Sequence, residues 1–254
     1  MSAETRRDNL VQYLQAHGRT KVKDLAEHFN ITGATIRSDL RYLEKKNLII
    51  RRYGGAEAVT KPLPEDRSMD EKTALNLNIK QRIGAKAAEL VNDGDSIILD
   101  SGSTTLQMVP WLAERVALTI MTNSLHIMNE AATLKSDMTL LMPGGTFRPR
   151  SASFHSQLAE QAVRAFTFDK LFIGADGFDI EQGTTTFNEA YQVSQAMCEA
   201  ARKTIVVTDS SKFGRKTPNV VIPIDKIDIL ITDTGINDAD YQALQQHNVQ
   251  VILV

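Results

Sequence analysis

Hydrophobic residues recur at helical spacing in two short segments near the N-terminus, residues 22–29 and 34–43. In each segment they lie three or four residues apart, which predicts an amphipathic helix that buries one face. Residues 4–17 show similar spacing, so three helices are expected to share one small core. The residues that this core is expected to bury are Leu10, Val11, Leu14, Val22, Leu25, Ala26, Phe29, Ile36, Leu40 and Leu43.

A four-residue turn, Asn30-Ile31-Thr32-Gly33, separates the second and third predicted helices. Gly33 is expected to form the corner, because glycine adopts backbone angles that other residues avoid. Residues 48–59 then predict a strand, a Gly-Gly turn and a returning strand with basic side chains. This order of elements is typical of a winged helix-turn-helix, and we assign residues 1–59 to such a DNA-binding domain.

The exposed face of the third predicted helix is short, polar and cationic, as in a helix that reads base edges in the major groove. The arginines of the hairpin are placed to meet phosphates. The residues assigned to DNA contact are Thr35, Arg37, Ser38 and Arg41 in the helix and Arg51 and Arg52 in the hairpin. A small three-helix unit that holds a dimer together is the alternative interpretation.

The charge distribution favours DNA contact through the N-terminus alone. Residues 1–57 hold 11 Lys and Arg against 7 Asp and Glu, a net charge of +4, whereas the whole chain carries −2. The remaining residues therefore carry −6. A basic module on an acidic body is suited to double-stranded DNA at one end only.

The pattern changes after residue 59. A charged segment with Pro62 and Pro64 leads us to interpret residues 60–76 as a linker, followed by a second domain over 77–254. In that domain, short and nearly all-apolar strands alternate with helical segments, which predicts a Rossmann-like α/β domain with a mostly parallel sheet covered on both faces. The expected strands are residues 96–100, 118–121, 138–142, 170–173, 205–207, 229–231 and 249–254.

Polar residues recur just past the carboxyl ends of these strands, at the edge where open α/β sheets bind ligands. Asp100-Ser101-Gly102-Ser103-Thr104 is a hydroxyl-rich loop before a predicted helix, where free amides and the helix dipole favour phosphate. An N-cap role for Ser103 or Thr104 is the alternative. The loops Thr122-Asn123-Ser124 and Gly144-Gly145 repeat the arrangement, which favours a pocket for a phosphate or a polyol.

Other polar side chains at this edge suit a sugar ligand. Asp176, Asn188 and Glu189 offer groups that hydrogen bond to sugar hydroxyls, and Lys212 is a candidate cation for a phosphate or a carboxylate. A turn role for Asp176, a helix-dipole role for Glu189 and a solvated Lys212 are the alternatives.

Further side chains are weaker candidates. Arg148 and Arg150 either line the mouth of the pocket or are solvated, and His155 either reaches the pocket or has the favoured capping or surface role. The five histidines are scattered, so no metal-ligand set is expected, and no motif for a cofactor is visible. The single cysteine, Cys198, is expected to be a buried apolar residue. A polar N-terminus and short apolar runs predict a cytoplasmic protein without a membrane partner.

Taken in order, these motifs resemble the DeoR family of bacterial transcription regulators over nearly the whole chain. The segments that carry the resemblance are Ala34–Leu40, Tyr53–Gly55, Asp100–Thr104, Thr122–Ser124, Pro143–Gly145, Gly174–Gly177, Thr186–Glu189 and Asp209–Phe213. Within the family the chain looks most like repressors of hexitol operons, those for glucitol and then galactitol. The runs that carry this closer likeness include MTNSLHI (121–127), LMPGGTF (141–147) and DSSKFGRK (209–216).

The resemblance implies a sensor domain shaped like ribose-5-phosphate isomerase, an effector that is a phosphorylated sugar or hexitol, and repression that the effector relieves. Two residues depart from the pattern: Ser156 stands where relatives often carry Gly, and Ser38 stands where many carry Lys or Arg. The shape of the pocket rim and the operator sequence are therefore not carried over. One such DNA-binding module buries little surface, so a homo-oligomer, a dimer or tetramer, is expected on repeated half-sites.

Two other functions compete with a non-enzymatic repressor. The first is a sugar-phosphate isomerase with a DNA-binding appendage, in which Glu189 or Asp176 would be the general base. Gly177 stands where such isomerases often have Glu, which counts against it. The second is a DNA-binding module whose C-terminal body only oligomerises.

Overall fold

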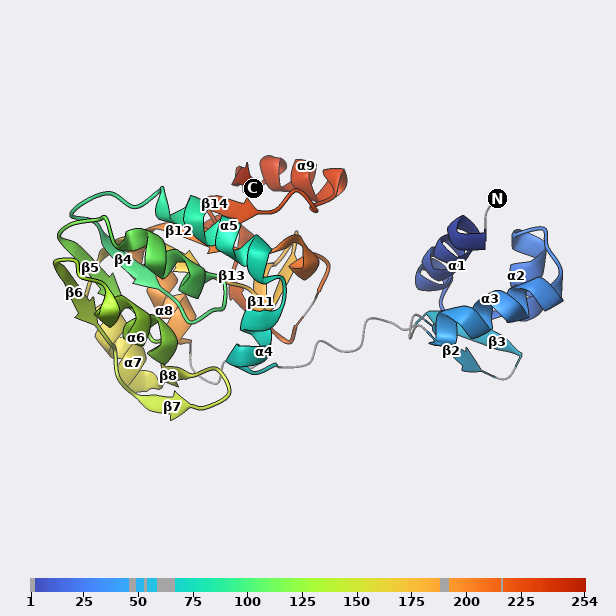
Figure 1. The fold of residues 1–254 in the computed structure, drawn as a ribbon, viewed down its shortest axis with the longest axis horizontal. Helices are drawn as coiled ribbons and strands as arrows, with labels where there is room; N and C mark the ends of the chain where they lie inside the picture. Colours follow the sequence, from blue (N-terminus) through green and yellow to red (C-terminus); the bar gives the residue numbers. More distant parts are fainter. Residues whose placement is uncertain (1–2, 46–48, 53, 59–66, 188–191, 216) are drawn as a thin grey trace. The chain divides into compact units, whose positions relative to one another are not determined.

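The computed structural model describes residues 3–45, 49–52, 54–58, 67–187, 192–215 and 217–254 (Figure 1). The chain divides into two compact units, Met1–Glu65 and Asp66–Val254. Each unit has its own hydrophobic core among the described residues, the smaller unit one cluster and the larger unit one on each face of its main sheet.

The described part of the smaller unit combines helices with an antiparallel sheet of strand order β1-β3-β2. Its elements are α1 (Ala3–His17), β1 (Thr20–Lys21), α2 (Val22–His28), α3 (Gly33–Lys45), β2 (Ile49–Arg52) and β3 (Gly55–Ala58). The core predicted from helical spacing is confirmed. Fully buried are Leu10, Leu14, Leu25, Ile36, Leu40 and Leu43, and the partly buried side chains around them are Val11, Val22, Ala26 and Phe29.

The corner between α2 and α3 lies at Asn30, so the prediction that Gly33 forms it is wrong. Asn30 has a left-handed backbone with φ 52°, whereas Gly33 is the first residue of α3 and has no positive φ. Asparagine tolerates this conformation because its short polar side chain can hydrogen bond locally. Thr32 then caps α3, since its Oγ1 accepts a hydrogen bond from the amide of Thr35 at 3.2 Å.

The larger unit is built on a seven-stranded sheet of order β15-β14-β12-β9-β4-β5-β6, in which every neighbouring pair is parallel. The strands are β4 (Ser96–Leu99), β5 (Leu118–Met121), β6 (Met138–Leu141), β9 (Phe168–Ile173), β12 (Ala201–Val207), β14 (Ile229–Thr232) and β15 (Gln250–Leu253). The predicted parallel α/β sheet is thereby confirmed.

Helices cover both faces of this sheet, because successive strand residues point to opposite sides. Ile97 and Leu99 pack in one cluster, whose helices are α5 (Leu77–Ala88), the 3-10 helix η1 (Thr105–Leu112) and α6 (Leu125–Thr133). Ile98 packs in the other, whose helices are α7 (Gln157–Arg164), α8 (Val193–Ala200) and α9 (Asp238–Gln246).

The larger unit also contains smaller elements. They are α4 (Met69–Ala74), the hairpin β7 (Thr146–Arg148) and β8 (Ser153–His155), the antiparallel strands β10 (Gly177–Asp179), β11 (Gly183–Thr186) and β13 (Asn219–Ile222), and the 3-10 helices η2 (Ser210–Lys212) and η3 (Ile224–Lys226). Thus residues 69–74 of the segment that we interpreted as a linker form a helix of the larger unit. No helix in the described ranges has the length and apolarity needed to cross a membrane.

Candidate functional site

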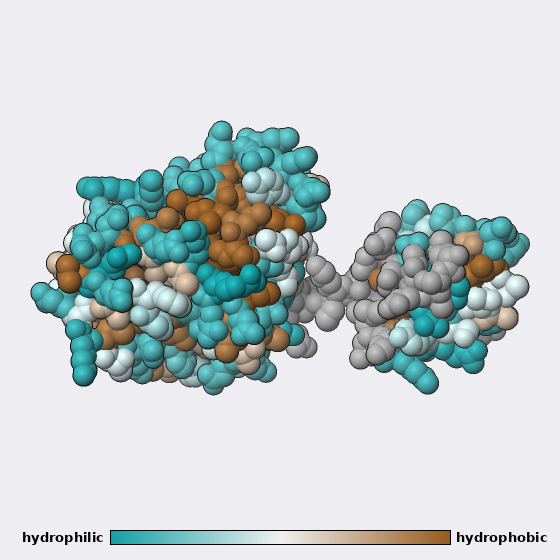
Figure 2. Space-filling model, turned by 45° about the horizontal axis from the view of Figure 1, so that its top comes forward, coloured by the Kyte–Doolittle hydropathy of each residue, from teal (hydrophilic) through white to brown (hydrophobic). Residues whose placement is uncertain are grey.

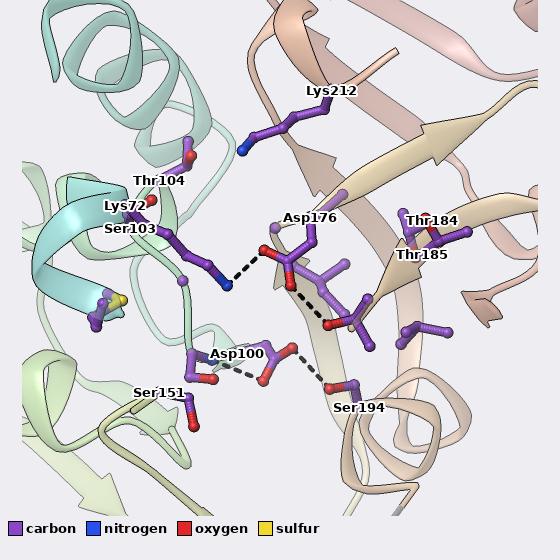
Figure 3. Close-up of a pocket in the computed structure, with 18 of the residues that line it drawn as sticks. Lys72, Asp100, Ser103, Thr104, Ser151, Asp176, Thr184, Thr185, Ser194 and Lys212 are labelled. Atoms are coloured by element: carbon purple, nitrogen blue, oxygen red, sulfur yellow. Dashed lines mark hydrogen bonds and ion pairs between the residues drawn. The ribbon is translucent and has the colours of Figure 1, made fainter. Parts of the chain in front are cut away.

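A cavity of about 130 Å³ lies at the carboxyl ends of β4, β9 and β12 (Figure 3). The loops that follow these strands contribute Asp100–Thr104, Gly174–Asp176 and Lys212 to its wall. Side chains from α4, β11, β13, α8 and the β7–β8 hairpin complete the wall. The position is the one that the parallel topology of the sheet favours for a ligand.

The loop of residues 101–104 borders the cavity and precedes a helix. Thr105 Oγ1 donates to the carbonyl oxygens of Asp100 (2.8 Å) and Gly102 (2.9 Å), which fixes the loop. Within the described part of the chain, the amides of Gly102, Ser103 and Thr104 donate to no protein acceptor. Thr104 is the N-cap residue of η1, yet its side chain makes no capping hydrogen bond, so the N-cap alternative does not account for this loop.

Asp100 is a buried carboxyl group beneath the loop. Its oxygens accept hydrogen bonds from the amide of Ser101 (2.7 Å) and from Ser194 Oγ (2.9 Å). Burial raises the pKa of Asp100 to about 6, although the hydrogen bonds from Ser194 and Ser101 oppose the rise. The pocket therefore contains a carboxyl group that gains or loses its proton close to neutral pH.

This raised pKa predicts a pH-dependent contribution to stability. An unfolded Asp has a pKa of roughly 3.9, so between about pH 4 and pH 6 the folded protein binds more protons at Asp100 than the unfolded protein does. The free energy of unfolding should thus fall as the pH rises through this window, by roughly 3 kcal/mol from this group. Urea denaturation of the wild type and Asp100→Asn at pH 4 and pH 7 measures the effect. The same difference between the two proteins at both pH values would contradict it.

Two of the predicted loops do not line the pocket, and one of them supports it. Thr122, Asn123 and Ser124 are fully buried; Asn123 Oδ1 accepts the amide of Ser101 at 2.9 Å, and Ser124 caps α6. Gly144 and Gly145 also lie outside the wall of the cavity. The candidate ligand contacts therefore reduce to those residues whose atoms border the cavity.

Asp176 and Lys212 both border the cavity, as the sequence predicted. Lys72 also borders it, although the sequence analysis did not assign it. Asp176 Oδ1 pairs with Lys72 Nζ at 2.6 Å, and its Oδ2 accepts from Thr186 Oγ1 at 2.9 Å. Lys212 points toward the same space in Figure 3, and its Nζ has no hydrogen bond or ion pair with any described residue. Burial lowers the pKa of Lys212, while Asp209 opposes this shift.

Several residues of the wall were not assigned from the sequence. These are Met69, Lys72, Ser151, Thr184, Thr185, Thr186, Ser194 and Val221. For Lys72 a usable signal existed: Ser68 and Glu71 have the spacing of a capping box, which predicts a helix in the segment interpreted as a linker. The structure contains this box, with Ser68 Oγ accepting from the amide of Glu71.

His155 lines the cavity and is only 7% exposed, so the favoured capping or surface role is wrong. Its Nε2 lies 2.7 Å from Ser153 Oγ, while its buried Nδ1 has no partner among the described residues. Burial and, second, the charge of Arg148 lower its pKa to about 4. The imidazole is thus neutral at pH 7.

Asn188 and Glu189, also predicted to bind the ligand, lie outside the described residues. Gly177 has a clear packing reason: an added Cβ would lie 2.1 Å from the carbonyl oxygen of Arg215 and 2.7 Å from Thr185 Oγ1. The backbone at this position therefore excludes the Glu that stands there in many sugar-phosphate isomerases.

In the smaller unit, Arg37, Ser38 and Arg41 are exposed on α3, as predicted. Thr35 is only partly exposed, and its hydroxyl lies 3.0 Å from that of Thr32. In β2, Arg51 is exposed and pairs with Glu44 at 3.3 Å. The side chain of Arg52, which completes the predicted set, lies outside the described part. The arginines of α3 are therefore accessible to a polyanion.

The helix that carries these arginines is anchored from its opposite face. Asp39 is 2% exposed and accepts hydrogen bonds from Arg6 Nε (2.7 Å) and Arg7 Nε (2.8 Å) of α1. Burial alone would raise the pKa of Asp39, but the two guanidinium groups together hold it below its usual value. Arg7 also lies over the ring of Tyr42, 3.9 Å from its centroid. These contacts fix the orientation of α3 on α1.

Removal of this carboxylate should destabilise the smaller unit. Asp39→Ala leaves two cations without their partner; because both retain some exposure, the expected loss is about 1–3 kcal/mol, below that of a fully buried pair. Hydrogen exchange of the α3 amides measures the loss. Glu27→Ala, which removes only an exposed pair with Lys23, is the matched control. Equal exchange in the two variants would show that Asp39 does not anchor α3.

Comparison with known proteins gives matches over both units. Residues 75–234 match the model for the DeoR C terminal sensor domain, and residues 6–62 match that for the DeoR-like helix-turn-helix domain. The chain is 38% identical over 252 residues to a putative aga operon transcriptional repressor of Escherichia coli O157:H7, covering 98% of this chain and 93% of the relative.

More distant relatives match over similar lengths. Identity is 33% over 236 residues to the transcriptional repressor AccR of Agrobacterium fabrum, covering 92% and 91% of the two chains. It is 27% over 254 residues to the glycerol-3-phosphate regulon repressor of Escherichia coli K12, covering both chains fully. Among solved structures, ribose 5-phosphate isomerase A from Methanocaldococcus jannaschii aligns over 56% of each chain with a TM-score of 0.41 and 19% identity.

Proposed function

Because the chain belongs to the DeoR family of transcriptional regulators, we propose that it represses a sugar or hexitol catabolic operon and that a phosphorylated sugar or hexitol releases it from operator DNA. The family resemblance expected from the sequence is confirmed, and the chain is a DNA-binding repressor of the sugar-operon type rather than an enzyme. The effector and the operon are our proposal.

The chemistry of the cavity is the observation that carries this proposal. The free amides of residues 102–104 and the Nζ of Lys212 suit a phosphate group. Asp176, Ser194 and the threonines of β11 suit a chain of hydroxyl groups. A phosphorylated polyol carries both kinds of group in one molecule.

For the DNA, we propose that α3 contacts base edges through Thr35, Arg37, Ser38 and Arg41, and that Arg51 and Arg52 of β2 contact phosphates. One module of this size buries too little surface for strong specificity, so a homo-oligomer on repeated half-sites is proposed. An extended hydrophobic area on the larger unit (Figure 2) supports association.

The test is fluorescence anisotropy of an operator fragment taken upstream of the neighbouring sugar operon. It is run with the full chain, with and without glucitol 6-phosphate and galactitol 1-phosphate. The proposal expects specific binding that one of the two compounds weakens by about 5- to 150-fold, the range of a coupling free energy of ~1–3 kcal/mol. The unphosphorylated hexitols are the controls. Specific binding that neither phosphate weakens would reject the proposed effectors.

A further inference from the structure

Helix α4 is the first element of the larger unit after the segment that joins the two units. The smaller unit ends at Glu65, and α4 begins at Met69, four residues later. Helix α4 is thus the described helix of the larger unit that lies nearest in the chain to the smaller unit.

The structure holds α4 in place through contacts with residues around the cavity. The amide of Met69 donates to the carbonyl of Arg150 at 3.0 Å, and the Met69 side chain is only 5% exposed. In the middle of the helix, Lys72 pairs with Asp176 at 2.6 Å. The buried Lys80 of α5 donates from Nζ to the carbonyl of Lys72 at 2.8 Å. The Lys72–Asp176 pair joins α4 to a charged group of the cavity wall, and Glu71 of α4 also interacts with the charge of Arg150.

This ion pair occupies the space that a ligand would need. Both residues line the cavity, and their side chains meet within it in Figure 3. The cavity measures about 130 Å³, whereas small-molecule sites usually measure roughly 300–1,000 Å³. A ligand of the size of a sugar phosphate thus requires the wall to move or the groups of the pair to be freed.

The charges around the pair favour such an exchange of partners. The charged residues that line the described part of the cavity are Lys72, Arg148, Arg150, Lys212, Asp100 and Asp176. A phosphate dianion attracts Lys72 more strongly than a single carboxylate does. Hydroxyl groups, in turn, can donate to the oxygens of Asp176 that Lys72 and Thr186 now occupy.

We infer that the Lys72–Asp176 ion pair is a latch that holds α4 against the pocket, and that an occupant of the pocket opens it by engaging one or both partners. Opening loosens α4 and, through the connecting segment, changes the affinity for operator DNA. The chemical class of the occupant rests on the function proposed above, whereas the latch itself rests on the contacts of α4.

The latch is tested first without ligand, by hydrogen exchange of residues 69–76 in the full chain. Lys72→Asp and Asp176→Lys each place like charges together and should accelerate exchange roughly 5- to 30-fold, as expected when a half-buried ion pair is broken. The double variant restores opposite charges and should return exchange to about the wild-type rate. Lys86→Asp breaks an exposed pair with Glu89 on α5 and is the matched control.

The exchange rates of these variants show whether the Lys72–Asp176 pair holds α4 in place. Fast exchange in both single variants, with recovery in the double variant and no change in the control, supports the latch. Single variants that exchange like the wild type overturn it. Fast exchange that the double variant does not reverse also overturns it, because the cause is then a general loss of packing rather than the charge pair.

Opening by a ligand is tested in the wild type with inorganic phosphate and glucitol 6-phosphate, whose binding calorimetry measures in parallel. A compound that binds should accelerate hydrogen exchange of residues 69–76 in the wild type. In Lys72→Asp, the same compound should not accelerate this exchange further. A compound that binds while exchange stays unchanged or slows overturns the opening step. If neither compound binds, glucitol 6-phosphate is rejected as the effector, and the latch is decided by the charge-swap variants.

Discussion

Arg37→Ala should weaken specific operator binding by about 5- to 150-fold per DNA-binding module, because a bidentate base contact contributes ~1–3 kcal/mol of discrimination. Arg37 is exposed in the first half of α3, the end of a recognition helix that faces base edges. Its guanidinium has no acidic partner among the described residues, so it is available for a base. The measurement is anisotropy with the operator fragment and with a scrambled fragment of equal length.

The loss of DNA binding in Arg37→Ala should depend on the DNA sequence. Specific binding should fall more than binding to the scrambled fragment, since a base contact carries sequence information and a phosphate contact does not. Arg202→Ala is the matched control, because Arg202 is 72% exposed on the larger unit and pairs only with Asp169 among the described residues. Operator binding by Arg37→Ala that equals the wild type would show that α3 is not the recognition helix.

Lys212→Met should lower the affinity for the phosphorylated effector by about 10- to 100-fold while operator binding without effector stays unchanged. Lys212 points into the cavity beside the free amides of residues 102–104, and a hydrogen bond to a charged group is worth about 1.5–3 kcal/mol. Methionine keeps the length and most of the volume of the side chain but removes the charge. The measurement is the effector concentration that releases half of the bound operator.

A second lysine of the same segment provides the control. Lys203 is exposed near the start of β12, whereas Lys212 follows the carboxyl end of that strand. Lys203→Met should therefore respond to the effector like the wild type. Half-release at the same effector concentration in Lys212→Met and the wild type would exclude Lys212 as the phosphate ligand.

The parts of the fold that follow from local spacing were predictable. Helical periodicity identified Leu25, Ile36 and Leu40 as core residues, and all three are buried. Apolar strands separated by helices gave the parallel sheet, and topology then placed Asp176 and Lys212 at one edge. These predictions succeed because the carboxyl ends of parallel strands share an edge regardless of the details of packing.

What the sequence could not give depends on contacts between distant segments. Asn123 follows its strand as Asp100 does, yet it is fully buried and supports the loop at Ser101. Lys72 reaches the cavity only because α4 packs beside Asp176, more than a hundred residues away in the chain. His155 is neutral and buried because of the tertiary environment around it, which spacing does not reveal.

The central claim is that the cavity at the carboxyl edge of the sheet recognises a phosphorylated hexitol. Isothermal titration calorimetry of the full chain tests it most directly, with glucitol 6-phosphate and galactitol 1-phosphate each compared with its unphosphorylated hexitol. The account predicts saturable binding of one phosphate, no binding of either free hexitol, and a large loss of affinity in Lys212→Met. Equal binding of a hexitol and its phosphate, or no binding of any of the four compounds, would contradict it.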